Sequence, residues 1–241
     1  MNLLVVSDLH LGPAHQQRAD EFLCFLKRAT QMKDEVLIVG DLFALWFGRP
    51  KLTFEYQQAI LQQMKVLVAE GLVMNYVEGN RDFGIGRYEG SLFRKVSDSW
   101  LERDWNGTRI YAEHGDLINS ADLQYRIWRA FSKNPLSFFL LNHLPSSLIL
   151  RMSSDLEREM QTTNQKHKSY FPDESCRKFY LRHFERGVDI VIVGHFHCEK
   201  EIRVQAANRD VLFYSLPGWE QGFRYLVIPE DKRKPYFEEL R

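Results

Sequence analysis

The chain has 241 residues, of which 44% are hydrophobic and 27% are charged. This length and composition suit one globular domain with a sizeable core, and they exclude a disordered or fibrous protein. Lys plus Arg equals Asp plus Glu, at 32 each, so the formal net charge is zero. Because the chain also lacks a basic stripe interleaved with aromatic residues, we expect no nucleic-acid partner.

The N-terminus and the cysteines indicate a cytoplasmic protein. The first apolar run covers only Leu3–Val6 and no basic segment precedes it, so it does not resemble a signal peptide. No apolar stretch approaches the roughly 20 residues that span a bilayer. The three cysteines lack the paired spacing of a zinc ribbon or a redox motif, and we expect thiols in a reducing compartment.

The N-terminal half alternates short apolar runs with longer amphipathic ones. Strand, helix and strand in this order predict right-handed crossovers and a mainly parallel sheet, which is an α/β fold. The predicted helices are Gln17–Thr30 and Phe54–Glu70, and the predicted core strands are Leu3–Val6, Val36–Val39, Val73–Val77, Arg109–Ala112 and Ile190–Val193. After Glu199, short segments between turn residues predict an antiparallel portion with strands at Ile202–Gln205, Val211–Tyr214, Tyr225–Ile228 and Tyr236–Glu239.

The middle of the chain, at about 121–186, is predicted to be mostly helical. No Gly-rich or Ser-rich linker separates it, so we interpret it as an insertion within a single domain, 1–241. It contains the apolar run Leu136–Leu150, which from the residues alone could pack on the sheet as core or cap an apolar ligand. Between Leu123 and Ser154 there is no acidic residue but four cationic ones, so this stretch could lie beside an anionic ligand.

Five short polar motifs each follow a predicted strand. They are Asp8-Leu9-His10, Gly40-Asp41, Gly79-Asn80-Arg81-Asp82, His114-Gly115-Asp116 and Gly194-His195-Phe196-His197. The carboxyl ends of strands in an open parallel sheet converge on one crevice, where ligand sites form. Each motif alone is compatible with an ordinary turn or a structural histidine pair, and the last one predicts two histidines on the same side of an extended segment. Five such motifs in this order favour a shared site.

The side chains of these motifs suit divalent metal ions. Two ions held roughly 3.5–4 Å apart need about seven protein ligands, including a carboxylate that bridges them. The sequence supplies seven candidates: Asp8, His10, Asp41, Asn80, His114, His195 and His197. Mixed oxygen and nitrogen ligands suit manganese, iron or zinc. Such ions lower the pKa of a water between them and neutralise charge on phosphorus oxygens, which predicts hydrolysis of a phosphoester or phosphoanhydride.

In this ordered set of motifs the chain resembles the calcineurin-like metallophosphoesterase superfamily over essentially its whole length. The resemblance implies a four-layer α-β-β-α sandwich with a helical cap insertion. It also implies two metal ions, Mn²⁺ above all. One ion would be held by Asp8, His10 and His197, the other by Asn80, His114 and His195, with Asp41 bridging them.

Within the superfamily the chain is most similar to the UDP-2,3-diacylglucosamine pyrophosphatases of the lipid A pathway. The features that carry this are Arg81 in place of a histidine, Asp122-x-x-Tyr125 after the His114 motif, and the apolar insertion. The resemblance implies a UDP-linked glycolipid substrate and peripheral contact with the inner membrane through the cap. Arg81, Asn80, His114 and His195 would be catalytic, and Arg81, His195, Asp122, Tyr125, Asn164, Lys166 and Lys168 would contact the substrate.

The chain also departs from that pattern. The usual G-H-T-H-R-P is Gly194-His195-Phe196-His197-Cys198-Glu199 here, and Met160 stands where the family has a serine. These differences retain the metal ligands and leave the substrate open. Two alternatives therefore stand beside the lipid pyrophosphatase: a metallophosphoesterase with a non-lipid substrate, and a non-catalytic binding module on the same fold. The complete ligand set argues against the binding module.

Overall fold

Two β-sheets lie face to face in the computed structural model, which describes residues 1–118, 171–206 and 209–240. The first sheet has the order β13 (Tyr236–Glu239), β12 (Arg224–Ile228), β1 (Leu3–Val6), β2 (Glu35–Val39), β4 (Val73–Val77) and β6 (Lys95–Ser97). The second has the order β10 (Lys200–Ala206), β11 (Arg209–Ser215), β9 (Ile190–Val193), β8 (Thr108–Glu113) and β7 (Trp100–Trp105). A small pair, β3 (Trp46–Phe47) with β5 (Asp82–Phe83), lies apart from both.

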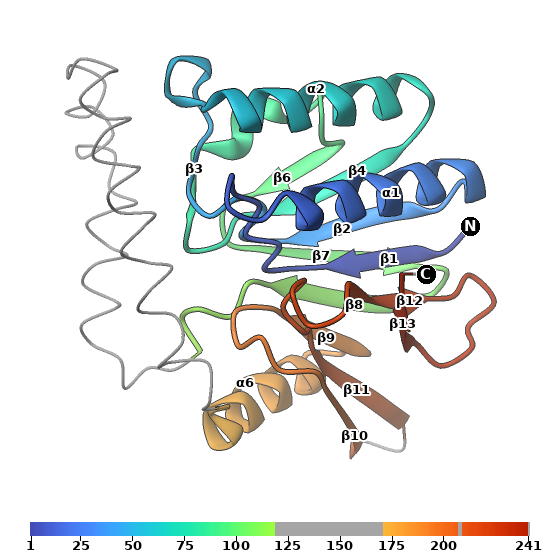
Figure 1. Ribbon diagram of the computed structural model, residues 1–241. Coiled ribbons are helices and arrows are strands. Elements are labelled where there is room, and N and C mark those ends of the chain that lie inside the picture. The colour runs from blue at the N-terminus through green and yellow to red at the C-terminus, as the bar shows by residue number, and fades with distance from the viewer. Residues whose placement is uncertain (119–170, 207–208, 241) are drawn as a thin grey trace.

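Helices cover the outer faces of the two sheets, as Figure 1 shows. The helices α1 (Gln16–Met32) and α2 (Glu55–Ala69) lie on the first sheet, and α6 (Asp173–Glu185) lies on the second. Short 3₁₀ turns occur at Pro50–Leu52 and Ile85–Tyr88. The architecture is therefore the expected four-layer α-β-β-α sandwich.

The strand β1 shows why four layers form. All four of its side chains are buried, because both faces of the first sheet are covered. Successive residues of a strand face opposite sides of the sheet. Leu4 and Val6 pack under the helices, while Leu3 and Val5 pack against the second sheet. A strand buried on both faces is an uninterrupted apolar run, which is the pattern that the sequence carries.

The second sheet has its own outer core. On its far side, Tyr180 and Phe184 of α6 pack with Val191 of β9 and Phe213 of β11. Within this sheet β8 and β9 run parallel, and β7 and β10 pair antiparallel at the two edges. The predicted antiparallel portion is confirmed for the pairs β10–β11 and β12–β13. On its other side β11 pairs in parallel with β9, a strand that precedes this portion.

The strands β6 and β7 were absent from the sequence-based prediction. The sequence of β7 is Trp-Leu-Glu-Arg-Asp-Trp, and only Leu101 and Trp105 are buried in it. An edge strand with one solvated face keeps few apolar residues, so its periodicity is weak.

Residues 119–170, which hold most of the predicted insertion, lie outside the described part of the chain. The run Leu136–Leu150 and the predicted substrate contacts Asp122, Tyr125, Asn164, Lys166 and Lys168 belong to it. The helix α6 falls in the predicted range 121–186 and is helical, as expected. Among the described helices, none is long and apolar enough to cross a membrane.

Candidate metal centre

The five polar motifs leave the carboxyl ends of strands in both sheets. Three of them follow β1, β2 and β4, which are parallel neighbours in the first sheet, and two follow β8 and β9, which are parallel neighbours in the second. The two groups of loops meet at one edge of the sandwich. There the backbone N–H of His195 donates a hydrogen bond of 2.8 Å to Oδ2 of Asp8, which joins the sheets directly.

Asp8, His10 and His197 form the first cluster of donor atoms. Nε2 of His197 lies 3.2 Å from Nε2 of His10 and 3.3 Å from Oδ1 of Asp8. The two imidazole rings are nearly parallel, with centroids 5.1 Å apart and an interplanar angle of 9°. All three residues offer ligand atoms that lie within 4.8 Å of one another. This spacing suits one cation shared by the three side chains.

Asn80, His114 and His195 form the second cluster. Oδ1 of Asn80 lies 2.9 Å from Nε2 of His114 and 3.1 Å from Nδ1 of His195. The other ring nitrogen of His114, Nδ1, lies 2.9 Å from the carbonyl oxygen of Val39. A carbonyl only accepts hydrogen bonds, so this contact keeps the proton on Nδ1 and leaves the lone pair of Nε2 for a ligand.

Asp41 lies between the two clusters. Its Oδ2 is 4.0 Å from Nδ1 of His10, in the first cluster, and 3.7 Å from Nε2 of His114, in the second. The backbone N–H of Arg81 donates a hydrogen bond of 2.9 Å to its Oδ1. Nε of Arg81 lies 3.5 Å from Oδ2, within ion-pair distance. The structure therefore brings all seven predicted metal ligands and Arg81 into one site, with Asp41 in the middle.

The backbone of the site is strained. Asp8, His10, Asp41, His195 and His197 all have positive φ angles, between 46° and 68°. Only nine residues other than glycine have a positive φ in the described part of the chain, and these five are the majority. Such conformations cost free energy and persist where the surrounding structure imposes them, which is typical of functional sites. His195 and His197 thus reach the site through left-handed backbone, and the predicted extended segment is wrong.

Two glycines allow the loops to approach this closely. A Cβ atom on Gly79 would lie 2.2 Å from Oδ1 of Asp41, and one on Gly194 would lie 2.9 Å from Oδ2 of Asp8. Any larger residue at either position would displace a carboxylate of the site. The glycines of these motifs therefore serve close packing around the donor atoms.

Burial and neighbouring charges shift the pKa values of the ionisable groups in the site. Burial raises the pKa of Asp8, but His197, His114 and His10 outweigh burial and hold that pKa well below its usual range. Burial raises the pKa of Asp41 despite the nearby His114 and Arg81. Burial, together with the positive charge of His114, lowers the pKa of His195 to about 4. His195 is thus neutral at pH 7, as a metal ligand must be.

A divalent cation fits this set of donors. Oδ1 of Asp8 and Nδ1 of His10 are buried and have no hydrogen-bond partner among the described residues. Buried polar atoms without partners are costly, and a bound cation would satisfy the carboxylate oxygen. Carboxylate, amide and imidazole donors without thiolates suit manganese, iron or zinc. Divalent metal binding is therefore supported by the chemistry of the site.

Two carboxylates that support the site were not predicted from the sequence. Oδ2 of Asp82 accepts hydrogen bonds of 2.8 Å from the backbone N–H groups of Asp41 and Gly79 and from the hydroxyl of Tyr76, so it ties the two loops together. Burial, together with the charge of Asp41, raises the pKa of Asp82 to about 7. Oε1 of Glu220 lies 3.1 Å from Nδ1 of His197. Asp82 follows Asn80 within the same motif, whereas Glu220 carries no local signal.

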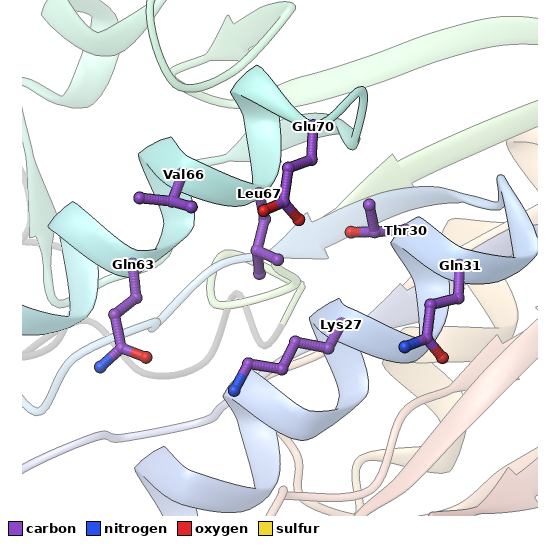
Figure 2. A pocket seen from close by; sticks show the side chains of 7 residues that line it. All are labelled: Lys27, Thr30, Gln31, Gln63, Val66, Leu67 and Glu70. Carbon is purple, nitrogen blue, oxygen red and sulfur yellow. The ribbon is translucent and has the colours of Figure 1, made fainter.

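A separate pocket lies between α1 and α2 (Figure 2). It is lined by Lys27, Thr30, Gln31, Gln63, Val66, Leu67 and Glu70. These residues belong to the carboxyl-terminal halves of the two helices, which run back along the parallel strands. The pocket is therefore at the opposite edge of the sheet from the strand ends that carry the donors. It is not part of the candidate metal centre.

Comparison with known proteins agrees with this geometry. The family model described as calcineurin-like phosphoesterase matches residues 1–199. A UDP-2,3-diacylglucosamine hydrolase of Psychromonas ingrahamii is 29% identical over 241 residues, covering 96% of this chain and 95% of the relative. One of Pseudomonas putida is 31% identical over 240 residues, covering 92% of this chain and 97% of the relative. The chain belongs to the calcineurin-like phosphoesterase family and is a phosphoester-cleaving hydrolase.

Proposed function

We propose that the chain hydrolyses the diphosphate of UDP-2,3-diacylglucosamine and releases UMP and 2,3-diacylglucosamine 1-phosphate, a step of lipid A biosynthesis. The observation that carries the proposal is the gathering of seven oxygen and nitrogen donors at one edge of the sandwich. Relatives named UDP-2,3-diacylglucosamine hydrolase support the substrate, since they match nearly the whole chain at about 30% identity. Divalent ions held by these donors would place positive charge beside phosphorus oxygens, and this suits a substrate with a diphosphate.

The centre takes two divalent ions in this proposal, and Mn²⁺ is the first choice. Asp8, His10 and His197 would hold one ion, Asn80, His114 and His195 would hold the other, and Asp41 would serve both clusters. The central position of Asp41, 4.0 Å from His10 and 3.7 Å from His114, supports this division. When bound, such a pair supplies Lewis acidity, which makes water nucleophilic near neutral pH and neutralises charge on phosphate.

The protein itself orients the donors and binds the phosphate. The carbonyl of Val39 holds the His114 ring with Nε2 turned toward Asn80. The Arg81 side chain is 6% exposed, and its Nε has no hydrogen-bond partner among the described residues. A guanidinium cannot act as an acid near neutral pH, but it presents several donors to phosphate oxygens. Arg81 therefore binds the charge that develops on the phosphate, beside Asn80 and His195.

The remaining substrate contacts come from the segment outside the described residues. Asp122 and Tyr125 border the sugar-phosphate, and Asn164 with Lys166 or Lys168 contacts the glucosamine and phosphate. The apolar run Leu136–Leu150 receives the acyl chains and gives the protein its contact with the inner membrane. Each buried methylene contributes roughly 0.8 kcal/mol, so the acylated substrate should bind far more tightly than its deacylated analogue.

The test is an assay of purified protein with added Mn²⁺ on three compounds: UDP-2,3-diacylglucosamine, its deacylated analogue and a generic aryl phosphodiester. We expect UMP release from the acylated compound at a much higher kcat/KM than from the deacylated one. Turnover of the aryl compound alone would favour a phosphoesterase with a non-lipid substrate. Absence of turnover on all three compounds would contradict the proposed hydrolase activity.

A charged substitution in the apolar run separates the lipid site from general damage. Phe139→Asp should lower turnover of the acylated substrate and spare the aryl phosphodiester, which does not use the acyl site. Equal loss on both substrates would indicate that this run is part of the folding core.

A further inference from the structure

The connection between β11 and β12 carries the chain from the second sheet back to the first, and it passes beside the metal centre. Trp219 anchors this connection: its side chain is fully buried, and its Nε1 donates a hydrogen bond of 3.1 Å to the carbonyl of Arg18 in α1. Its backbone N–H lies 3.3 Å from the carbonyl oxygen of Asp8. The next residue, Glu220, is therefore held at a defined place beside the first donor cluster.

Two contacts join this connection to His197, and a glycine makes room for one of them. Oε1 of Glu220 lies 3.1 Å from Nδ1 of His197, and the Gln221 side-chain amide donates a hydrogen bond of 2.8 Å to the His197 carbonyl. A Cβ atom on Gly218 would lie 2.4 Å from Nδ1 of His197 and 2.8 Å from Oε2 of Glu220. Glycine at position 218 thus leaves the space in which the carboxylate and the imidazole meet. Their side chains are 18% and 8% exposed.

The contact fixes the use of both ring nitrogens of His197. A carboxylate accepts a hydrogen bond, so Nδ1 donates its proton to Glu220, and Nε2, which faces His10 and Asp8, is the nitrogen left for a metal ion. Two of the other three histidine donors have no carboxylate behind the ring. Nδ1 of His114 meets a neutral carbonyl, and Nδ1 of His10 has no hydrogen-bond partner among the described residues.

A carboxylate behind a metal-bound histidine orients the ring and raises its basicity, and loss of such a partner typically weakens metal binding 10–100-fold. We infer that Glu220 is a positioning residue that makes the ion held by Asp8, His10 and His197 the more tightly bound of the two. The inference rests on the proposed two-ion centre. Glu220 lies outside all five polar motifs, so this role goes beyond the predicted ligands.

The test is a titration of the metal-free full chain with Mn²⁺, followed by calorimetry and by the electron paramagnetic resonance signal of free Mn²⁺. We expect two ions of unequal affinity in the unmodified protein. Glu220→Ala should weaken the tighter ion by about 10–100-fold and leave the weaker ion unchanged. Glu220→Gln keeps the shape and the hydrogen bond but removes the charge, so it should give a smaller loss at the same ion.

Glu199→Gln is the matched control. Glu199 is two residues from His197, but its carboxylate pairs with Arg224 at 2.6 Å, so its loss removes a charge from the same loop without touching the ring. Both Mn²⁺ affinities should stay as in the unmodified protein. The Tm of each metal-free variant shows whether the fold is intact. If Glu220→Ala lowers that Tm, the Mn²⁺ affinities of Glu220→Gln decide the role of Glu220 instead.

Two outcomes would overturn the role of Glu220: unchanged affinities in both of its variants, or equal weakening of both ions by Glu220→Gln. A single ion in the unmodified protein would instead contradict the two-ion proposal. The effect of Glu220→Ala on that ion would still decide the role of Glu220. If the unmodified protein binds no Mn²⁺, both proposals are wrong.

Discussion

Nε2 of His10 and Nε2 of His197 lie 3.2 Å apart although 187 residues separate the two histidines in the chain. One follows β1 in the first sheet and the other follows β9 in the second. Two neutral imidazoles cannot both direct lone pairs at each other at this distance without a proton or a cation between them. The pair therefore marks the place where donor atoms from the two sheets meet around a proton or a cation.

Removal of Asp41 should abolish the metal centre. Asp41→Ala deletes the carboxylate that lies between the two donor clusters, so bound Mn²⁺ and nearly all hydrolysis should be lost. Metal content by elemental analysis and turnover of the acylated substrate measure this. Asp231→Ala is the control, since Asp231 is exposed in the connection between β12 and β13, at the opposite edge of the first sheet. A fully active Asp41→Ala would contradict the mechanism.

Loss of the Arg81 side chain should slow the reaction without removing metal. Arg81→Ala should raise the barrier by about 2–4 kcal/mol, the scale of one preorganised charge donor, and this is measured as a lower kcat. Metal content should stay as in the unmodified protein, and the exposed Arg87→Ala should change neither quantity. The guanidinium also bonds to the carbonyl of Ala44 at 3.3 Å. A joint fall of metal content, Tm and kcat would mean that Arg81 anchors the loop.

A methyl group on Gly79 should disrupt the centre. The Cβ of Gly79→Ala would meet Oδ1 and the backbone nitrogen of Asp41 at 2.2 and 2.7 Å. Overpacking of this kind costs typically 1–3 kcal/mol, so Tm and Mn²⁺ content should both fall. Gly86→Ala is the matched control, because a Cβ there meets nothing within 4 Å. Equal behaviour of the two variants would show that the loops can move apart at no cost.

The stability of the metal-free protein should fall from about pH 6.5 to about pH 9. Burial lowers the pKa of His197, but Asp8 and Glu220 outweigh burial and raise it from 6.5 to about 9. A histidine that binds its proton more tightly when folded contributes stability below pH 6.5, and this is lost as the pH rises through 9. His114, whose pKa is also raised, acts in the same direction. Tm measured in EDTA across this range tests the trend, which His197→Gln should weaken.

Bound Mn²⁺ should stabilise the protein more at high pH than at low pH, which opposes this trend. Metal ions compete with protons for the histidines, so Mn²⁺ affinity rises with pH, and a ligand that binds only the folded state stabilises it. The Tm difference between Mn²⁺-loaded and EDTA-treated protein should therefore grow from pH 6.5 to 9. A constant difference would argue against histidine ligands.

Local sequence patterns were sufficient for much of the fold. Leu3–Val6 and Ile190–Val193 are uninterrupted apolar runs, Val73–Val77 is interrupted only by Asn75, and each of the three is a strand with the predicted bounds. These strands are buried on both faces, so hydrophobicity alone marks them. The site was predictable from the polar residues that follow these strands. A ligand crevice forms at the carboxyl ends of parallel strands, and the chain carries Asp8, His10 and the other donors at those ends.

The tertiary structure decided what depends on contacts between distant segments. The edge strand β7 has one solvated face, so its sequence lacks the apolar signal that marks the central strands. The left-handed backbone at His195 and His197 occurs where their loop meets the Asp8 loop of the other sheet, and no local pattern predicts it. Glu220 lies 23 residues after His197 in the connection between β11 and β12, and only the return of the chain from the second sheet to the first brings it to the imidazole.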